Sequence, residues 1–216
     1  GDVGEAYQKA YDKWPDKEEL MKDLADFLST AGSYSTFTEK LYRGALEGYE
    51  RELGPDHPDT LTSVNNLGIL LKDKGDYEGA EKLYRRALEG REKQLGPDHP
   101  STLTSVSNLG SLLWVMGDNE GAEKLHRRAL EGNERELGPD HSNTLKSVNS
   151  LGILLSDKGD YEGAEKLFRR TLEGKEKALG PDHPETLKSV NNLGFLLKNK
   201  GDYEGAEKLY RRALEG

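Results

Sequence analysis

The chain has no cysteine, only 7% aromatic residues, and no apolar run longer than Leu112–Met116. The lack of cysteine excludes disulfides, thiolate nucleophiles and cysteine-based metal sites. A helix that crosses a bilayer needs about 20 mostly apolar residues, so we expect no membrane span. No charged segment followed by an apolar one opens the chain, so no signal peptide is predicted and the cytosol is the favoured compartment.

Long blocks of one charge and the usual motifs of catalysis are also missing. The net charge of −9 comes from 40 acids and 31 bases mixed along the sequence, which argues against nucleic acid or an anionic membrane as partners. The sequence contains no GxxxxGK[ST], GxSxG, HExxH or GxGxxG pattern. We therefore predict that the protein is not an enzyme and needs no cofactor or metal.

Most of the chain is one unit written four times. The string LGPDH begins at four evenly spaced positions, Leu53, Leu95, Leu137 and Leu179, so the period is 42 residues without insertions. Pro58–Gly90 and Pro184–Gly216 differ at only four positions. A fixed period of this size indicates a repeat array, in which each unit packs on its neighbours.

Each unit predicts two antiparallel helices joined by a short turn. Apolar residues of the first helix recur at steps of three and four, as on one helix face: Leu61, Val64, Leu67 and Leu71. Pro58 marks the start of this helix, and Asp56 or Thr60 is the candidate N-cap.

The turn and the second helix are also marked by residue type. Gly75 supplies a left-handed stop, and Asp76 is the expected N-cap of a helix that runs to Gln94. Gly68 and Ala80 let the two helices approach closely. Gly79 and Gly90 each cost roughly 1 kcal/mol relative to alanine inside a helix, and the sequence offers no reason for them.

The N-terminal part is a divergent version of the same unit. We predict a lone helix over Asp2–Trp14 and one helix pair over residues 16–52, which together form a cap over residues 1–52. Four near-identical repeats then fill residues 53–216. Divergence is typical of a terminal repeat, because it shows solvent a face that inner repeats bury.

Val64, Leu67-Gly68 and Leu71, followed by Ala80, Tyr84 and Ala87, resemble the tetratricopeptide repeat signature. The 42-residue period, the Asn-Asn-Leu run and the LGPDHP linker are similar to the variety found in kinesin light chains. The resemblance implies an all-α, right-handed superhelical solenoid of antiparallel helix pairs. It also implies a scaffold for protein–protein interaction, whose first helices line a concave groove that holds a partner peptide.

The groove-lining residues that the resemblance implies form a stripe beside the core face of each first helix. In the first repeat they are Thr62, Asn65, Asn66, Ile69 and Lys72, flanked by Asp73. In the later repeats they are Thr104, Ser107, Asn108, Ser111 and Trp114; Lys146, Asn149, Ser150, Ile153 and Ser156; and Lys188, Asn191, Asn192, Phe195 and Lys198.

Two interpretations of the asparagines in this stripe remain open. An amide both donates and accepts, so a row of them can bind the backbone of an extended peptide. Alternatively, the amides hold neighbouring helices in register. Ile69 and Phe195 favour the groove, because they lie off the core stripe and need a partner. Lys146 and Lys188 suggest that the later repeats take a mildly acidic peptide.

Histidines and basic residues also recur with the repeat. Equivalent points in successive repeats lie roughly 8–10 Å apart or more, so the linker histidines, such as His57, cannot share a metal and are expected to be polar linker residues. His126 replaces the aromatic residue found at Tyr84. The stripe of Lys82, Arg85 and Arg86 is spaced from glutamates as on a solvated helix face, so nucleic-acid binding is not favoured.

A structural role is the competing hypothesis. The array could be a spacer without a peptide ligand, or it could self-associate end to end. In the latter case the face that inner repeats bury would be presented by the last helix, and a second copy would dock on it.

Overall fold

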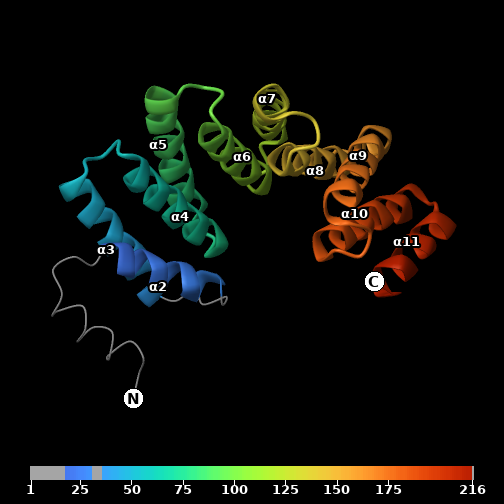
Figure 1. Cartoon of the computed structure of the whole chain (residues 1–216), viewed down its shortest axis with the longest axis horizontal. Coiled ribbons are helices and arrows are strands. Elements are labelled where there is room, and N and C mark those ends of the chain that lie inside the picture. The colour runs from blue at the N-terminus through green and yellow to red at the C-terminus, as the bar shows by residue number, and fades with distance from the viewer. Residues whose placement is uncertain (1–17, 31–35, 216) are drawn as a thin grey trace, which may run out of the picture. The chain divides into compact units, whose positions relative to one another are not determined.

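The computed structural model describes residues 18–30 and 36–215, and within them the chain forms ten helices and no strand (Figure 1). The predicted lone helix over Asp2–Trp14 lies outside the described residues. The chain divides into two compact units, residues 1–97 and 98–216, which are called the N-terminal and C-terminal units below.

The helices alternate as first and second members of antiparallel pairs, as predicted. The N-terminal unit contains α2 (Glu18–Thr30), α3 (Thr36–Glu52), α4 (Pro58–Asp73) and α5 (Tyr77–Leu95). The C-terminal unit contains α6 (Pro100–Val115), α7 (Asn119–Leu137), α8 (Ser142–Asp157), α9 (Tyr161–Leu179), α10 (Pro184–Lys200) and α11 (Tyr203–Glu215).

The prediction of Asp56 or Thr60 as the N-cap of the first helix is wrong. The N-cap is His57, whose Nδ1 accepts a hydrogen bond from the backbone N–H of Asp59 at 3.2 Å, and Pro58 follows at the first helical position. His99, His141 and His183 cap their helices in the same way. The linker histidines are therefore helix caps, a role that a neutral Nδ1 lone pair can fill.

Asp56 and Thr60 stabilise the linker in other ways. The Thr60 hydroxyl donates to the Gly54 carbonyl at 2.8 Å, and the equivalent contacts recur in the C-terminal unit. Asp56 pairs with Lys93 at 3.3 Å. The threonine closes the linker over the start of the helix, so its hydroxyl is not available as a cap.

The turn between the helices matches the prediction. Gly75 has φ +86°, a left-handed conformation that residues with a Cβ rarely adopt. The Asp76 carboxylate accepts from the N–H of Gly79 at 2.9 Å and caps α5, which ends one residue beyond the predicted Gln94.

Close contacts explain Gly79 and Gly90. A Cβ on Gly79 would lie 2.4 Å from the capping carboxylate of Asp76, and one on Gly90 would lie 2.6 Å from Leu61. Gly132 and Gly174 meet Leu103 and Leu145 in the same way. These glycines therefore let a leucine of the first helix and an N-cap carboxylate lie against the second helix.

The two helices of a pair also meet at a ring. A Cβ on Gly68 would lie 2.8 Å from the ring of Tyr84, which is 1% exposed. Phe168 and Tyr210 occupy the same slot against Gly152 and Gly194. The predicted core stripe of α4 is buried throughout.

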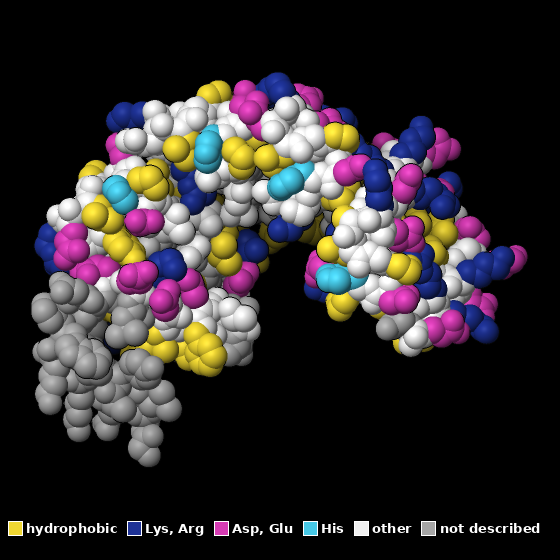
Figure 2. All heavy atoms as spheres, in the orientation of Figure 1, with side chains coloured by type: hydrophobic (Ala, Val, Ile, Leu, Met, Phe, Trp, Pro, Cys, Tyr) yellow, Lys and Arg dark blue, Asp and Glu magenta, His cyan; other side chains and the backbone are white. Residues whose placement is uncertain are grey.

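Ion pairs tie second helices to the preceding pair. Arg86 on α5 pairs with Glu50 on α3 at 2.6 Å, and Arg170 on α9 pairs with Glu134 on α7 at 2.5 Å. Arg85 pairs with Glu81 within α5. Acidic and basic side chains are interspersed on the surface (Figure 2). The recurring arginines thus form ion pairs within their own helix and with the preceding second helix.

His126 fills the ring slot of α7 and is 2% exposed. Burial lowers the pKa of His126 to about 4, and its Nδ1 has no hydrogen-bond partner. The folded chain therefore keeps this imidazole neutral, whereas the unfolded chain protonates it below its ordinary pKa of 6.5. Its contribution to stability is complete above pH 6.5 and is lost as the pH falls towards 4.

We expect His126→Phe to make the protein less sensitive to acid, because Phe168 shows that a phenyl ring fits the slot. The loss of unfolding free energy between pH 7 and pH 5 should be smaller by about 2 kcal/mol in the variant. Urea titrations at the two pH values measure this loss. Equal losses in both proteins would show that His126 is not held neutral.

Candidate functional site

The predicted stripe of α4 divides into buried and accessible residues. Asn65 is only 6% exposed, so it does not present its amide to solvent. Thr62, Asn66, Ile69 and Lys72 are half-buried. The Thr62 hydroxyl donates to the Pro58 carbonyl at 2.9 Å, and Lys72 lies 3.3 Å from Asp73.

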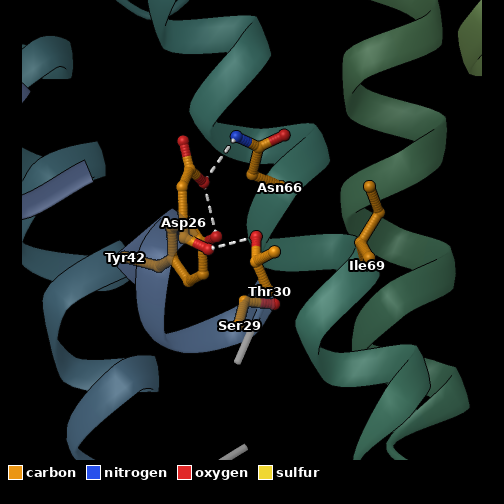
Figure 3. A pocket seen from close by; sticks show the side chains of 6 residues that line it. All are labelled: Asp26, Ser29, Thr30, Tyr42, Asn66 and Ile69. Atoms are coloured by element: carbon orange, nitrogen blue, oxygen red, sulfur yellow. Dashed lines mark hydrogen bonds between the residues drawn. The ribbon is translucent and has the colours of Figure 1, made fainter. Parts of the chain in front are cut away.

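Asn66 and Ile69 line a pocket of about 240 Å³ with residues of the divergent N-terminal pair (Figure 3). The carboxylate of Asp26 on α2 is one of its lining groups. One of its oxygens accepts from the Tyr42 hydroxyl at 2.5 Å and from the Asn66 amide at 3.2 Å, and the other accepts from Lys22 at 3.1 Å. Thr30 donates to the backbone carbonyl of Asp26 at 2.8 Å. The carboxylate is thus neutralised and holds α2, α3 and α4 together.

A second pocket, of about 420 Å³, lies farther along α2 and α4. Its lining is Glu18, Glu19, Lys22, Tyr49, Glu52, Leu53, Asp59 and Thr62. We call the two pockets together the α2/α4 groove. On α4 its residues follow steps of three, four and three: Asp59, Thr62, Asn66 and Ile69. This spacing defines one helix face.

The electrostatics of this groove differ between its two pockets. Burial and the Asp26 carboxylate raise the pKa of the Tyr42 hydroxyl. The hydrogen bond to Asp26 raises the pKa of Lys22, so its ammonium is held charged. Burial, with the Glu19 carboxylate, raises the pKa of Tyr49. The Asp26 carboxylate of the small pocket is paired with Lys22, whereas the larger pocket is lined by four acids and one base.

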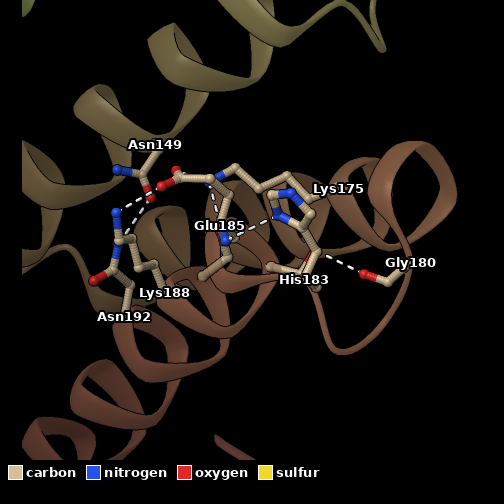
Figure 4. A network of polar contacts seen from close by, with 9 residues as sticks. Asn149, Lys175, Gly180, His183, Glu185, Lys188 and Asn192 are labelled. Carbon is tan, nitrogen blue, oxygen red and sulfur yellow. Dashed lines mark hydrogen bonds and ion pairs between the residues drawn. The ribbon is translucent and has the colours of Figure 1, made fainter. Parts of the chain in front are cut away.

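In the C-terminal unit, two predicted residues bind each other. The Asn192 amide of α10 donates to the Asn149 amide oxygen of α8 at 3.0 Å (Figure 4). Trp114 of α6 donates its ring N–H to the Asp157 carboxylate of α8 at 3.0 Å. In each of these two hydrogen bonds, the donor and acceptor residues are 43 residues apart. The two contacts therefore join successive first helices in the same way. Asn149 and Asn192 thus provide the register contact that was the alternative interpretation.

Other members of the stripe face solvent. Lys146, Asn191 and Lys198 are exposed, and Phe195 is 54% exposed. Lys188 is exposed but pairs with Glu185 at 2.6 Å. Ile153 packs against the core of the C-terminal unit, so this side chain needs no outside partner, although the sequence could not show that. Asn108 is half-buried.

Sequence reasoning missed the residues that the divergent pair contributes to the groove. Asp26, Tyr42 and Tyr49 were not among the predicted site residues, although Tyr42 aligns with the buried Tyr84. One signal was available in the sequence. The repeat position that holds Arg91, Asn133 and Lys175 in the later repeats holds Tyr49 in the divergent pair.

The repeat signature is matched over most of the chain. The family model described as tetratricopeptide repeat matches residues 36–93, 65–134, 102–177 and 149–216. The chain belongs to the tetratricopeptide repeat family. A comparison with curated protein sequences finds no match.

Several solved tetratricopeptide-like structures are similar. A candidate kinesin light chain from Podosopora anserina, with nearly identical TPR-like repeats, has a TM-score of 0.75 at 21% identity and covers 94% of this chain and 96% of its own. BtubC (BKLC) from P. vanneervenii has a TM-score of 0.77 at 27% identity, with 99% and 85% covered. MamA from Desulfovibrio magneticus RS-1 has a TM-score of 0.62 at 18% identity, and the match covers 93% of this chain and 95% of MamA. The matches at 21% and 18% identity establish the fold alone.

Two features are absent from the part of this tetratricopeptide array that the structure describes. Over residues 18–30 and 36–215, no three His, Cys, Asp or Glu side chains gather closely enough to hold a metal ion. No helix in the described ranges is both long and apolar enough to cross a membrane.

We expect Asn149→Ala and Asn191→Ala to differ in stability. Loss of the Asn149–Asn192 hydrogen bond should cost about 1 kcal/mol of unfolding free energy. Asn191 is exposed, so its replacement should change stability by less than about 0.5 kcal/mol. Urea unfolding of the two variants measures both values. Equal losses would contradict the assignment of Asn149 as the register contact.

Proposed function

We propose that this tetratricopeptide array is a protein–protein interaction scaffold that holds an extended segment of a partner along its first helices. The observation that carries the proposal is the set of groups on this face that repeat packing does not use. Asn191, Phe195 and Lys198 are exposed together on α10, and Lys146 is exposed on α8. An amide, a phenyl ring and two ammonium groups can bind a peptide backbone, an apolar anchor and acidic side chains respectively.

The α2/α4 groove supports the same proposal in the N-terminal unit. Its two pockets follow one face of α4, as side chains of an extended peptide would require. The exposed lysines of α8 and α10 favour an acidic segment on the C-terminal unit. Because each contact is modest, affinity would arise from several repeats bound by one chain.

A peptide-library pulldown with three proteins tests this function. The wild type is compared with a groove variant, Asn191→Ala, Phe195→Ala and Lys198→Ala. The control variant carries Lys124→Ala, Lys166→Ala and Lys208→Ala, which remove exposed lysines from α7, α9 and α11. We expect peptides that bind the wild type and the control, and fewer on the groove variant.

Peptides that bind the wild type and groove variant equally would overturn a role for these residues. Peptides lost only with the control variant would move the binding surface to the second helices. Circular dichroism of the three proteins establishes that they are equally folded.

Self-association is the second candidate function, and the α11 face favours it. Leu214 is 87% exposed, whereas the equivalent Leu130 and Leu172 are only 9% and 8% exposed. This apolar face could bind the same face of a second copy or an end of another array. Sedimentation across a wide concentration range should show association, and Leu214→Glu should abolish it. A monomer mass at every concentration would exclude this function.

A further inference from the structure

The larger pocket of the α2/α4 groove combines an apolar floor with carboxylates. Tyr49 and Leu53 contribute the apolar surface from the end of α3 and the residue after it. Glu19 of α2, Glu52 of α3 and Asp59 of α4 provide carboxylates. An aromatic ring beside carboxylates suits a side chain with an aliphatic stem and a cationic head.

Two bases lie in or beside this pocket, and both are paired with carboxylates. Lys22 lies 3.1 Å from Asp26 and 3.5 Å from Asp23. Arg51 pairs with Glu18 at 3.1 Å and lies 3.6 Å from Glu52, and both of these acids line the pocket. Among residues 18–30 and 36–215, Glu19 and Asp59 have no lysine or arginine partner, and the Asp59 carboxylate lies 3.6 Å from Nδ1 of His57. The pocket therefore keeps negative charge that the described array does not neutralise.

The last repeat shows what occupies the equivalent place. Lys175 stands at the repeat position of Tyr49, and Glu185 stands at that of Asp59. The Lys175 ammonium donates to the backbone carbonyl of Glu185 at 3.0 Å and lies 3.5 Å from its carboxylate (Figure 4). The lysine side chain is only 16% exposed. The array itself thus places a half-buried basic side chain at this position.

In the N-terminal unit, Tyr49 cannot supply that charge. The aromatic ring leaves room for a pocket of about 420 Å³, and Asp59 keeps both its carboxylate and the backbone carbonyl equivalent to the one that Lys175 binds. A cation supplied by another molecule would complete the arrangement seen in the last repeat.

We propose that the pocket formed by Tyr49, Leu53, Glu19 and Asp59 binds a lysine or arginine side chain of an extended partner segment. The stem lies on Tyr49 and Leu53, and the cationic head binds the carboxylates. This inference rests on the proposed peptide-binding function and gives it a chemical preference.

Nuclear magnetic resonance titration with single amino-acid probes tests the charge preference. The probes are N-acetyl-arginine amide, N-acetyl-lysine amide and the uncharged isostere N-acetyl-citrulline amide. We expect the two cationic probes to shift the amide signals of Glu19, Asp59 and Thr62, and citrulline to shift them far less. Equal shifts with citrulline, or shifts confined to other helices, would overturn the proposal.

Three variants locate the site. Glu19→Gln with Asp59→Asn should weaken arginine binding about fivefold, since these carboxylates are solvent-exposed. Tyr49→Lys should abolish binding, because an internal ammonium then occupies the pocket. Lys175→Tyr should create a second site at Glu185. Circular dichroism verifies folding. If Tyr49→Lys does not fold, the double carboxylate variant still tests the site, because it retains the shape of the pocket.

The outcomes separate this inference from the general function. Library peptides that bind along α8 and α10 while the cationic probes leave the pocket unshifted would sink the basic pocket alone. Binding of the cationic probes at Tyr49 without any library peptide would sink the general scaffold and keep the pocket. Unchanged arginine affinity in the double carboxylate variant would sink the assignment of Glu19 and Asp59.

Discussion

The structure depends on the close approach of the two helices in each pair, which the glycines of both helices permit. A ring of the second helix lies against Gly68 or its equivalent, and a leucine of the first helix lies against Gly90, Gly132 or Gly174. Any Cβ at these glycines would press on a side chain with almost no exposed surface. Because both contacts recur with the repeat, the two helices of each regular pair pack against each other in the same way.

That geometry determines which polar groups are free. On the second helices, arginines are used in ion pairs within the helix and with the preceding pair. On the first helices, Asn149 and Asn192 bind each other, while Asn191 and Phe195 face solvent. One helix face therefore serves both inter-repeat register and, in our proposal, recognition. The divergent first pair differs because Asp26 and Tyr42 replace that pattern with a network around a pocket.

Local features of the fold could be predicted because the signals lie within a few residues. Gly75 marks the turn through its backbone conformation, and Asp76 marks it through a hydrogen bond to a residue three positions later. The N-cap prediction was wrong because the His57 nitrogen competes with the nearby Asp56 and Thr60. The contacts that Asp56 and Thr60 make instead depend on the folded linker. The 42-residue period gave the number of helix pairs, but it could not reveal the tight contacts of Gly79 and Gly90.

The candidate site was less predictable because its partners are far apart in sequence. Asn66 meets Asp26 from 40 residues away, in a segment where the repeat pattern has diverged. The burial of Asn65 and the packing of Ile153 depend on neighbouring helices, so residue type alone gave them the same expected exposure as Asn191 and Phe195. Spacing placed the predicted residues on one helix face, whereas the division of that face into structural and accessible residues required the structure.

The central claim is that the first helices carry the binding surface. The most direct measurement is amide hydrogen exchange of the chain with and without a peptide selected by the library. We expect slower exchange in α4, α8 and α10 on binding, with α5, α7 and α9 unchanged. Slower exchange confined to the second helices would contradict it.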